Sequence, residues 1–259
     1  GNGGDGIRSI SDRLLLEVWP EEVICDWEFR FDLPRQVGEG GWSPRGLLAV
    51  LNNTSGDTYY DVPCGVIRHA NGEPSFFAAS RFAAVCGKEG TAAIIPLGGE
   101  QSFFSHARVG ELGLCLGAST EGEPRERPEC TIDQRGYAHH HMPSMGNVFF
   151  GSVRHRFAIL LGEGDWRAIN LPAAASAHSQ QPVIYETAPS QWRGDLPSSG
   201  VLLGLSPINV EIVAVRLSGE RPQVLLSETH GQDTTATVIV AETTREVPLR
   251  PFQVANVEL

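Results

Sequence analysis

Long apolar runs and clusters of basic residues are both missing from this chain of 259 residues. No segment approaches the ~20 consecutive apolar residues that a membrane-spanning helix needs. The start, GNGGDGIRSISD, has neither the basic residues nor the apolar stretch of a signal peptide. We therefore expect no membrane partner and a cytoplasmic location. The net charge of -11 argues against nucleic acid as a partner, because nucleic-acid-binding surfaces are usually basic.

Recognisable catalytic and metal-binding motifs are absent as well. The five cysteines are far apart without Cys-x-x-Cys spacing, so we expect free thiols, with Cys64, Cys86 and Cys115 buried in strands. No Gly-x-Ser-x-Gly sequence marks a serine nucleophile, and no Lys-Ser or Lys-Thr follows the glycine-rich start. Since the chain begins without Met, we expect it to be processed or to be a segment of a longer protein.

Alternating apolar and polar residues dominate what is present. In CDWEFRFDLP, at 25–34, Trp27 and its apolar neighbours alternate with charged residues, which predicts a strand with one face on a core. Similar runs recur along the chain, and almost none has helical periodicity. They are RGLLAVLNN, YYDVPCGVIRH, TAAIIPLG, ELGLCLGA, HRFAILLG, VEIVAVRLS, PQVLLSE, TATVIVA and FQVANVEL.

Turn-forming residues separate these runs, so the sequence predicts an all-β protein built from antiparallel sandwiches. We expect one large sandwich domain at 1–195 and a small C-terminal β domain at 196–259. The boundary falls at the end of a long stretch rich in Ala, Ser and Pro, at 171–200, which we interpret as a connection. The charged segment at 119–130 is interpreted as an exposed loop.

Three consecutive histidines stand in GYAHHHMPSMGN, at 136–147. If this segment were a strand, His139 and His141 would share a face and could bind a metal together. No Cys, Asp or Glu recurs nearby at a ligand spacing, so we predict no metal site. We favour a polar loop on a sandwich rim, where His139, His141 and Arg135 could donate hydrogen bonds to sugar hydroxyls.

Two of the five tryptophans lie in polar, turn-like sequence. Trp42 and Trp192 are therefore candidate stacking platforms for a sugar ring. Trp19, Trp27 and Trp166 are expected to pack in the core or to anchor a turn.

Three blocks within 57–241 resemble, in order, the C-terminal β domain of glycoside hydrolase family 38, the retaining α-mannosidases. The first block matches at Val62, Pro63, Gly65, Val66, Glu73, Pro74 and Phe82. The second matches at His155, Arg156, Phe157, Gly164, Asp165, Trp166 and Pro182. The third matches at Pro207, Asn209, Val210, Glu228 and Gly231. The segment with Asp133, Arg135, Gly136 and His139 fits a further strand of the family loosely.

The resemblance implies a galactose mutarotase-like supersandwich followed by a small sandwich. In that family the nucleophilic Asp and the zinc ligands belong to an N-terminal catalytic domain, which has no counterpart in this sequence. We therefore expect a non-catalytic chain without a cofactor, zinc being confined to the missing domain. Its expected partners are that catalytic domain and a mannose-containing saccharide.

Two alternatives remain open at this point. The first is a stand-alone carbohydrate-binding module, which would bind sugar without turning it over. The second is a mutarotase-type enzyme that pairs a His with a Glu across the sheet, and a single His substitution would abolish its activity. The accessory-domain hypothesis instead predicts an exposed apolar surface where the catalytic domain packs.

Overall fold

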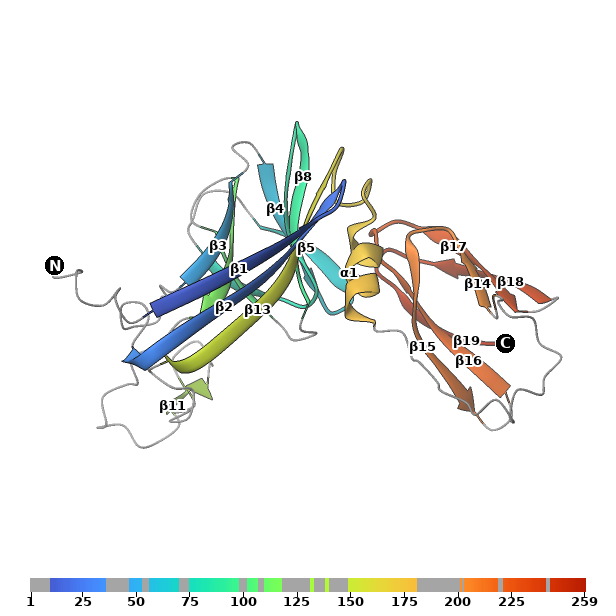
Figure 1. The fold of residues 1–259 in the computed structure, drawn as a ribbon. Coiled ribbons are helices and arrows are strands. Elements are labelled where there is room, and N and C mark those ends of the chain that lie inside the picture. Colours follow the sequence, from blue (N-terminus) through green and yellow to red (C-terminus); the bar gives the residue numbers. More distant parts are fainter. Residues whose placement is uncertain are drawn as a thin grey trace, which may run out of the picture.

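The fold is described by a computed structural model, shown in Figure 1. The structure describes residues 10–35, 47–52, 56–69, 75–97, 102–106, 110–117, 131–132, 138–139, 149–180, 201, 203–218, 221–240 and 243–259. Strands form most of this part, and every strand pairing is antiparallel. The predicted all-β class is therefore confirmed.

A large sandwich occupies the first two thirds of the chain. One sheet has seven strands in the order β1-β2-β13-β8-β7-β4-β5, and the other has four in the order β3-β10-β9-β6. The seven are β1 Ile10–Val18, β2 Glu22–Arg35, β13 Phe149–Gly162, β8 Gly90–Pro96, β7 Ala83–Gly87, β4 Gly56–Val62 and β5 Gly65–His69. The four are β3 Leu47–Asn52, β10 Glu111–Gly117, β9 Ser102–His106 and β6 Ser75–Ala79. A separate short pair is formed by β11 Thr131–Ile132 and β12 Ala138–His139.

Side-chain alternation along the strands supplies two cores, one on each face of the seven-stranded sheet. In β13, Phe157 and Ile159 pack into the core between the two sheets, whereas Ala158 and Leu160 pack on the opposite face. The core between the sheets is lined by Cys25, Ala79, Ala83, Val85, Ile94, Phe104, Leu112, Leu114 and Phe157. This period of two is what places one residue set on each face.

A short helix, α1 (Leu171–Ser179), covers the second face of the large sheet. The interpretation of this segment as a connection is wrong for these nine residues. Pro172 lies in the first helical turn, where its missing N–H costs nothing, and the Ala residues that follow favour a helix. Leu171, Pro172 and Ala175 are buried, so packing against the sheet stabilises a helix too short to be stable alone.

The small sandwich follows, with two sheets of three strands. Their orders are β14-β17-β18 and β15-β16-β19. The first contains β14 Leu203–Ser206, β17 Thr234–Val240 and β18 Thr243–Leu249, and the second contains β15 Val210–Ser218, β16 Arg221–Glu228 and β19 Val254–Glu258. Its core consists of Val210, Val224, Leu226, Ala236, Val238, Leu249 and Val257. The predicted boundary near 195 lies in 181–200, outside the described residues, and stays a prediction.

Two expectations about single side chains are wrong. Cys64 is exposed, because it occupies the Pro63-Cys64 turn between β4 and β5 with a left-handed backbone (φ 61°). Trp19 is 60% exposed in the turn between β1 and β2. Trp27 packs against the core and Trp166 is buried, as expected. No helix in the described part of the chain is long and apolar enough to cross a membrane.

Candidate functional site

The predicted sugar-contacting residues lie outside the part of the chain whose side chains the structure describes. Arg135, His141, Trp42 and Trp192 are in undescribed segments, and His139 is described only as backbone, paired with Thr131. Their role stays a prediction. Within the described ranges, no three His, Cys, Asp or Glu side chains are grouped so that they could bind a metal ion.

An apolar surface on the edge strand β1 is the first notable feature. Leu14, Leu16 and Val18 are 43%, 55% and 73% exposed, and Trp19 follows them in the hairpin turn. These four residues are called the β1 flank. Exposed apolar side chains that gather on one face often mark a contact with a partner.

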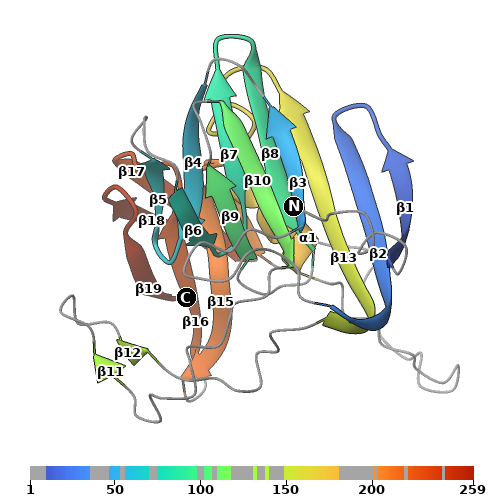
Figure 2. The ribbon, with the colours of Figure 1, turned by 90° about the vertical axis from the view of Figure 1, so that its left-hand side faces the viewer.

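Strand register explains why the β1 flank is uncovered. Leu14, Leu16 and Val18 stand opposite Trp27, Cys25 and Val23, which belong to the face of the large sheet that packs on the smaller sheet. That smaller sheet has only four strands against seven. Figure 2 shows its strands lying over β4, β7 and β8, whereas β1 stands beyond them at the free edge. The face of the large sheet that packs on the four-stranded sheet therefore extends beyond the edge of that smaller sheet.

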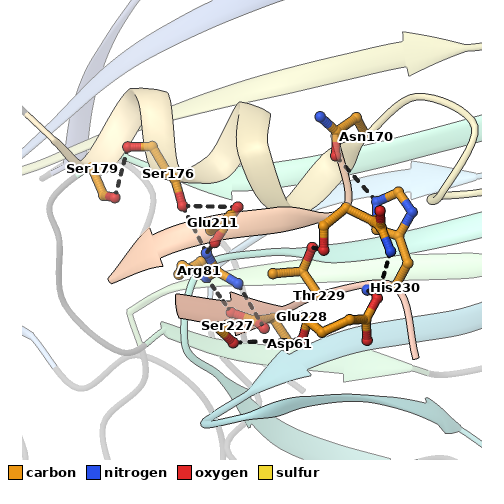
Figure 3. A network of polar contacts seen from close by, with 11 residues as sticks. Asp61, Arg81, Asn170, Ser176, Ser179, Glu211, Ser227, Glu228, Thr229 and His230 are labelled. Atoms are coloured by element: carbon orange, nitrogen blue, oxygen red, sulfur yellow. Dashed lines mark hydrogen bonds and ion pairs between the residues drawn. The ribbon is translucent and has the colours of Figure 1, made fainter. Parts of the chain in front are cut away.

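A polar junction between the two sandwiches is the second feature, and Arg81 is at its centre (Figure 3). Arg81 precedes β7 and donates to Asp61 Oδ2 at the end of β4 over 2.7 Å. Its Nη1 donates to Ser176 Oγ on α1 over 2.7 Å and to Glu211 Oε2 on β15 over 2.9 Å. One guanidinium thus connects the large sheet, the helix and the small sandwich.

Burial and the neighbouring charges shift the pKa values of Asp61 and Arg81. Burial raises the pKa of Asp61, although the hydrogen bond and charge of Arg81 oppose the effect. For Arg81, burial alone would lower the pKa, but Asp61 and Glu211 outweigh it and raise that pKa. The guanidinium therefore stays charged between its two acidic partners.

Glu228, at the end of β16, organises the loop that faces the large sandwich. Its side chain is buried, and each carboxylate oxygen accepts several hydrogen bonds. The donors to Oε1 are Asn209 Nδ2 (3.0 Å) and the backbone N–H of His230 (2.8 Å). The donors to Oε2 are the backbone N–H groups of Gly231 (2.8 Å), Gln232 (3.2 Å) and Phe252 (2.9 Å). Burial alone would raise the pKa of Glu228, but these hydrogen bonds lower it below its ordinary value.

His230 carries the contact across to the large sandwich. Its Nε2 lies 3.1 Å from Asn170 Oδ1, and its ring meets the edge of Trp166 with centroids 5.7 Å apart. Burial lowers the pKa of His230, which favours the neutral ring. We assign the proton to Nε2, because an amide oxygen can only accept. Arg167 Nε also donates to the His230 carbonyl over 2.7 Å, and its guanidinium lies 4.2 Å from the centre of the Trp166 ring.

Several residues that carried the family resemblance meet at this junction. Trp166, Asn209, Glu228 and Gly231 all belong to it. Asp61, Arg81, Glu211 and His230 were missed, because the contacts between them join residues far apart in sequence. The stretch Glu228-Thr229-His230-Gly231 is a local signal, since the Glu228 carboxylate accepts the backbone N–H of Gly231 only three residues further along.

The acidic side chains of this junction take part in contacts between its elements. The carboxylates of Asp61, Glu211 and Glu228 all accept hydrogen bonds from nearby donors. The crevice beside them, lined among others by Cys64, Arg81 and Thr229, has a volume of about 40 Å³. That is room for a few water molecules at most, well below the ~300 Å³ at which ligand pockets begin.

Comparison with known proteins adds a likeness of fold. No protein-family model matches the sequence, and no curated protein does. The structure of an alpha-mannosidase from Enterococcus faecalis V583 matches with a TM-score of 0.68 and 12% identity, over 96% of this chain and 28% of that one. A glycosyl hydrolase family 38 protein from Enterococcus faecalis matches with a TM-score of 0.66 and 12% identity, over 96% of this chain and 29% of that one.

The match spans less than a third of the length of either enzyme. At 12% identity such a likeness establishes the fold and does not establish the activity. The described chain is thus folded as one part of a family 38 α-mannosidase is, which confirms at the level of fold the resemblance seen in the sequence.

Proposed function

We propose that this chain is the non-catalytic β part of an α-mannosidase-like glycoside hydrolase that acts on mannose-containing glycans. In this proposal a separate catalytic part supplies the nucleophile and the zinc. The described residues of this chain do not form a zinc site, since no three potential ligands are grouped among them.

The β1 flank is the observation that supports this proposal most directly. An accessory part must bury an apolar face against its partner, and the β1 flank continues a core face beyond its cover. The two structures that share the fold each have more than two thirds of their length outside the match, so they contain ample chain to form such a cover. We assign the catalytic part as the occupant of the β1 flank.

The expected energy of this contact is moderate. Leu14, Leu16, Val18 and Trp19 are each about half exposed or more. Burying the surface that is still exposed on each of these side chains contributes about 1 kcal/mol, or about 4 kcal/mol in total. The conformational entropy lost on docking is not subtracted from this value. A linked domain needs no more than this, because covalent connection keeps its effective concentration high.

The first test is the reading frame upstream of Gly1. We expect it to encode several hundred residues with zinc-ligating His and Asp. A stop codon directly upstream would contradict the proposal and would leave the stand-alone carbohydrate-binding module as the better hypothesis. Calorimetric titration with mannose and short mannosides would then test that module.

The second test uses the complete enzyme. We expect Leu16→Asp and Trp19→Ser to lower mannosidase activity and to expose the connection between the two parts to limited proteolysis. Ile239→Asp is the matched control, because Ile239 is 45% exposed on β17 of the small sandwich, away from the β1 flank. Equal activity and equal proteolysis in all three variants would show that the β1 flank is not the docking surface.

A further inference from the structure

We propose that the two sandwiches unfold as one cooperative unit, and that Glu228 is the positioning residue that makes them cooperative. The inference concerns the junction alone, so it holds or fails independently of the proposed function. Domains within one chain move independently by default unless their interface is large or well anchored. Cooperative unfolding therefore requires a junction that anchors each sandwich to the other.

Hydrogen bonds, ion pairs and apolar packing all cross the junction. Arg81 and Glu211 pair across it, and Arg167 and Asn170 both bind His230. The ring of Phe252, which follows β18 of the small sandwich, packs into the core cluster formed by α1 and the large sheet. The small sandwich therefore covers part of the core between α1 and the large sheet. If either sandwich unfolded, apolar surface of the other would become exposed to water.

Glu228 fixes the backbone of the two segments of the small sandwich that contact the large sandwich, at 230–232 and at 252. Its carboxylate holds the loop with His230 and Gly231 on one side and the backbone of Phe252 on the other. Gly231 (φ 72°) and Phe252 (φ 56°) both have left-handed backbones. Glycine adopts this conformation without strain, whereas for Phe252 it persists only where the surroundings hold it. Glu228 itself touches no residue of the large sandwich in these hydrogen bonds. It acts on the interface through His230 and Phe252.

Replacing the carboxylate by an amide isolates this role. Glu228→Gln keeps the size of the side chain, but an amide presents one acceptor oxygen in place of two, so it leaves backbone N–H groups of the loop without a partner. We expect the loop and Phe252 to lose their fixed shape while the core of the small sandwich, formed by Val224 and Leu226 among others, stays intact.

Calorimetry of the full chain tests the proposal. We expect the wild type to show one transition with equal calorimetric and van't Hoff enthalpies. In Glu228→Gln we expect a separate small-sandwich transition, lowered by about 5–10 °C. Glu258→Gln is the matched control, since Glu258 pairs with Arg221 on the same sandwich away from the junction, and it should keep one transition.

Hydrogen exchange separates this role from general loss of stability. In Glu228→Gln the amides at 229–232 and 252 should exchange at least tenfold faster, whereas those at 224–226 and 236–238 stay protected. If Glu228→Gln does not fold, Asn170→Gly provides the test. It removes the side chain that binds His230, and glycine tolerates the left-handed backbone of Asn170 (φ 48°). Two transitions in the wild type would overturn the proposal, as would a single unshifted transition in the folded variants.

Discussion

Removing the guanidinium of Arg81 is the perturbation with the most closely defined consequence. In Arg81→Met the carboxylate of Asp61, whose side chain is only 4% exposed, loses its counter-charge. Breaking a buried ion pair on one side costs about 3–5 kcal/mol. Because the Arg81 side chain is 29% exposed, we expect the lower end, about 3 kcal/mol of unfolding free energy at pH 8.

The cost should depend on pH in a defined direction. Burial raises the pKa of Asp61 above its ordinary value of 3.8, and loss of Arg81 removes the group that opposes this effect. Arg81→Met is therefore fully destabilised only at pH values above the raised pKa that Asp61 has in the folded variant. As the pH falls toward 3.8, Asp61 takes up a proton in the folded state and the penalty shrinks. We expect a difference of about 1 kcal/mol near pH 4.5, the size of a lost neutral hydrogen bond.

Urea unfolding followed by tryptophan fluorescence at several pH values measures both quantities. Arg154→Met is the control, since the Arg154 side chain is 66% exposed where it pairs with Asp26 on the same sheet and should matter little at any pH. Asp61→Asn combined with Arg81→Met should recover part of the loss at pH 8, because no buried charge remains. A loss below about 0.5 kcal/mol, or a loss that grows on acidification, would refute the reasoning.

Two further predictions concern the Glu228 loop. Gly231→Ala should lower the unfolding free energy by about 1–3 kcal/mol, since Gly231 has φ 72° and an added Cβ would lie 2.7 Å from the Phe252 ring. Gly65→Ala, whose Cβ would meet nothing nearer than 3.7 Å, should change little in the same urea titration. The stabilisation by Glu228 should be complete above its ordinary pKa of 4.5 and be lost as the pH falls through the lowered folded pKa. The gap between the unfolding free energy of the wild type and that of the small-sandwich transition in Glu228→Gln, measured by urea unfolding from pH 3 to 7, should therefore close in acid, and a gap that widens there would contradict this.

The strands were predictable because the pattern of apolar side chains that marks a strand lies within a few consecutive residues. In a run such as HRFAILLG, successive apolar residues point to opposite faces of a strand. In β13 they do so, and each face packs into its own core. The helix α1 was not predictable in this manner. It has nine residues and no apolar stripe, and it is stabilised by burial against the sheet rather than by its own periodicity.

The junction could be predicted only in part. The Gly-Asp-Trp turn and the block that contains Asn209 and Glu228 were visible in the sequence, but the hydrogen bond between those two residues and the place where the blocks meet were not. The Arg81 to Glu211 contact joins residues 130 apart, and nothing in the sequence around either one indicates the other. Trp19 and Cys64 were misassigned for a related reason: whether a residue beside a strand is buried depends on what lies across from the turn.

The most direct test of the central claim is the activity of the purified chain alone, assayed on a chromogenic α-mannoside with added zinc. The proposed role predicts no hydrolysis above the buffer rate, because the groups that cleave the glycosidic bond belong to another part of the enzyme. Sustained turnover that co-purifies with the chain and is abolished by a single substitution within it would contradict this role.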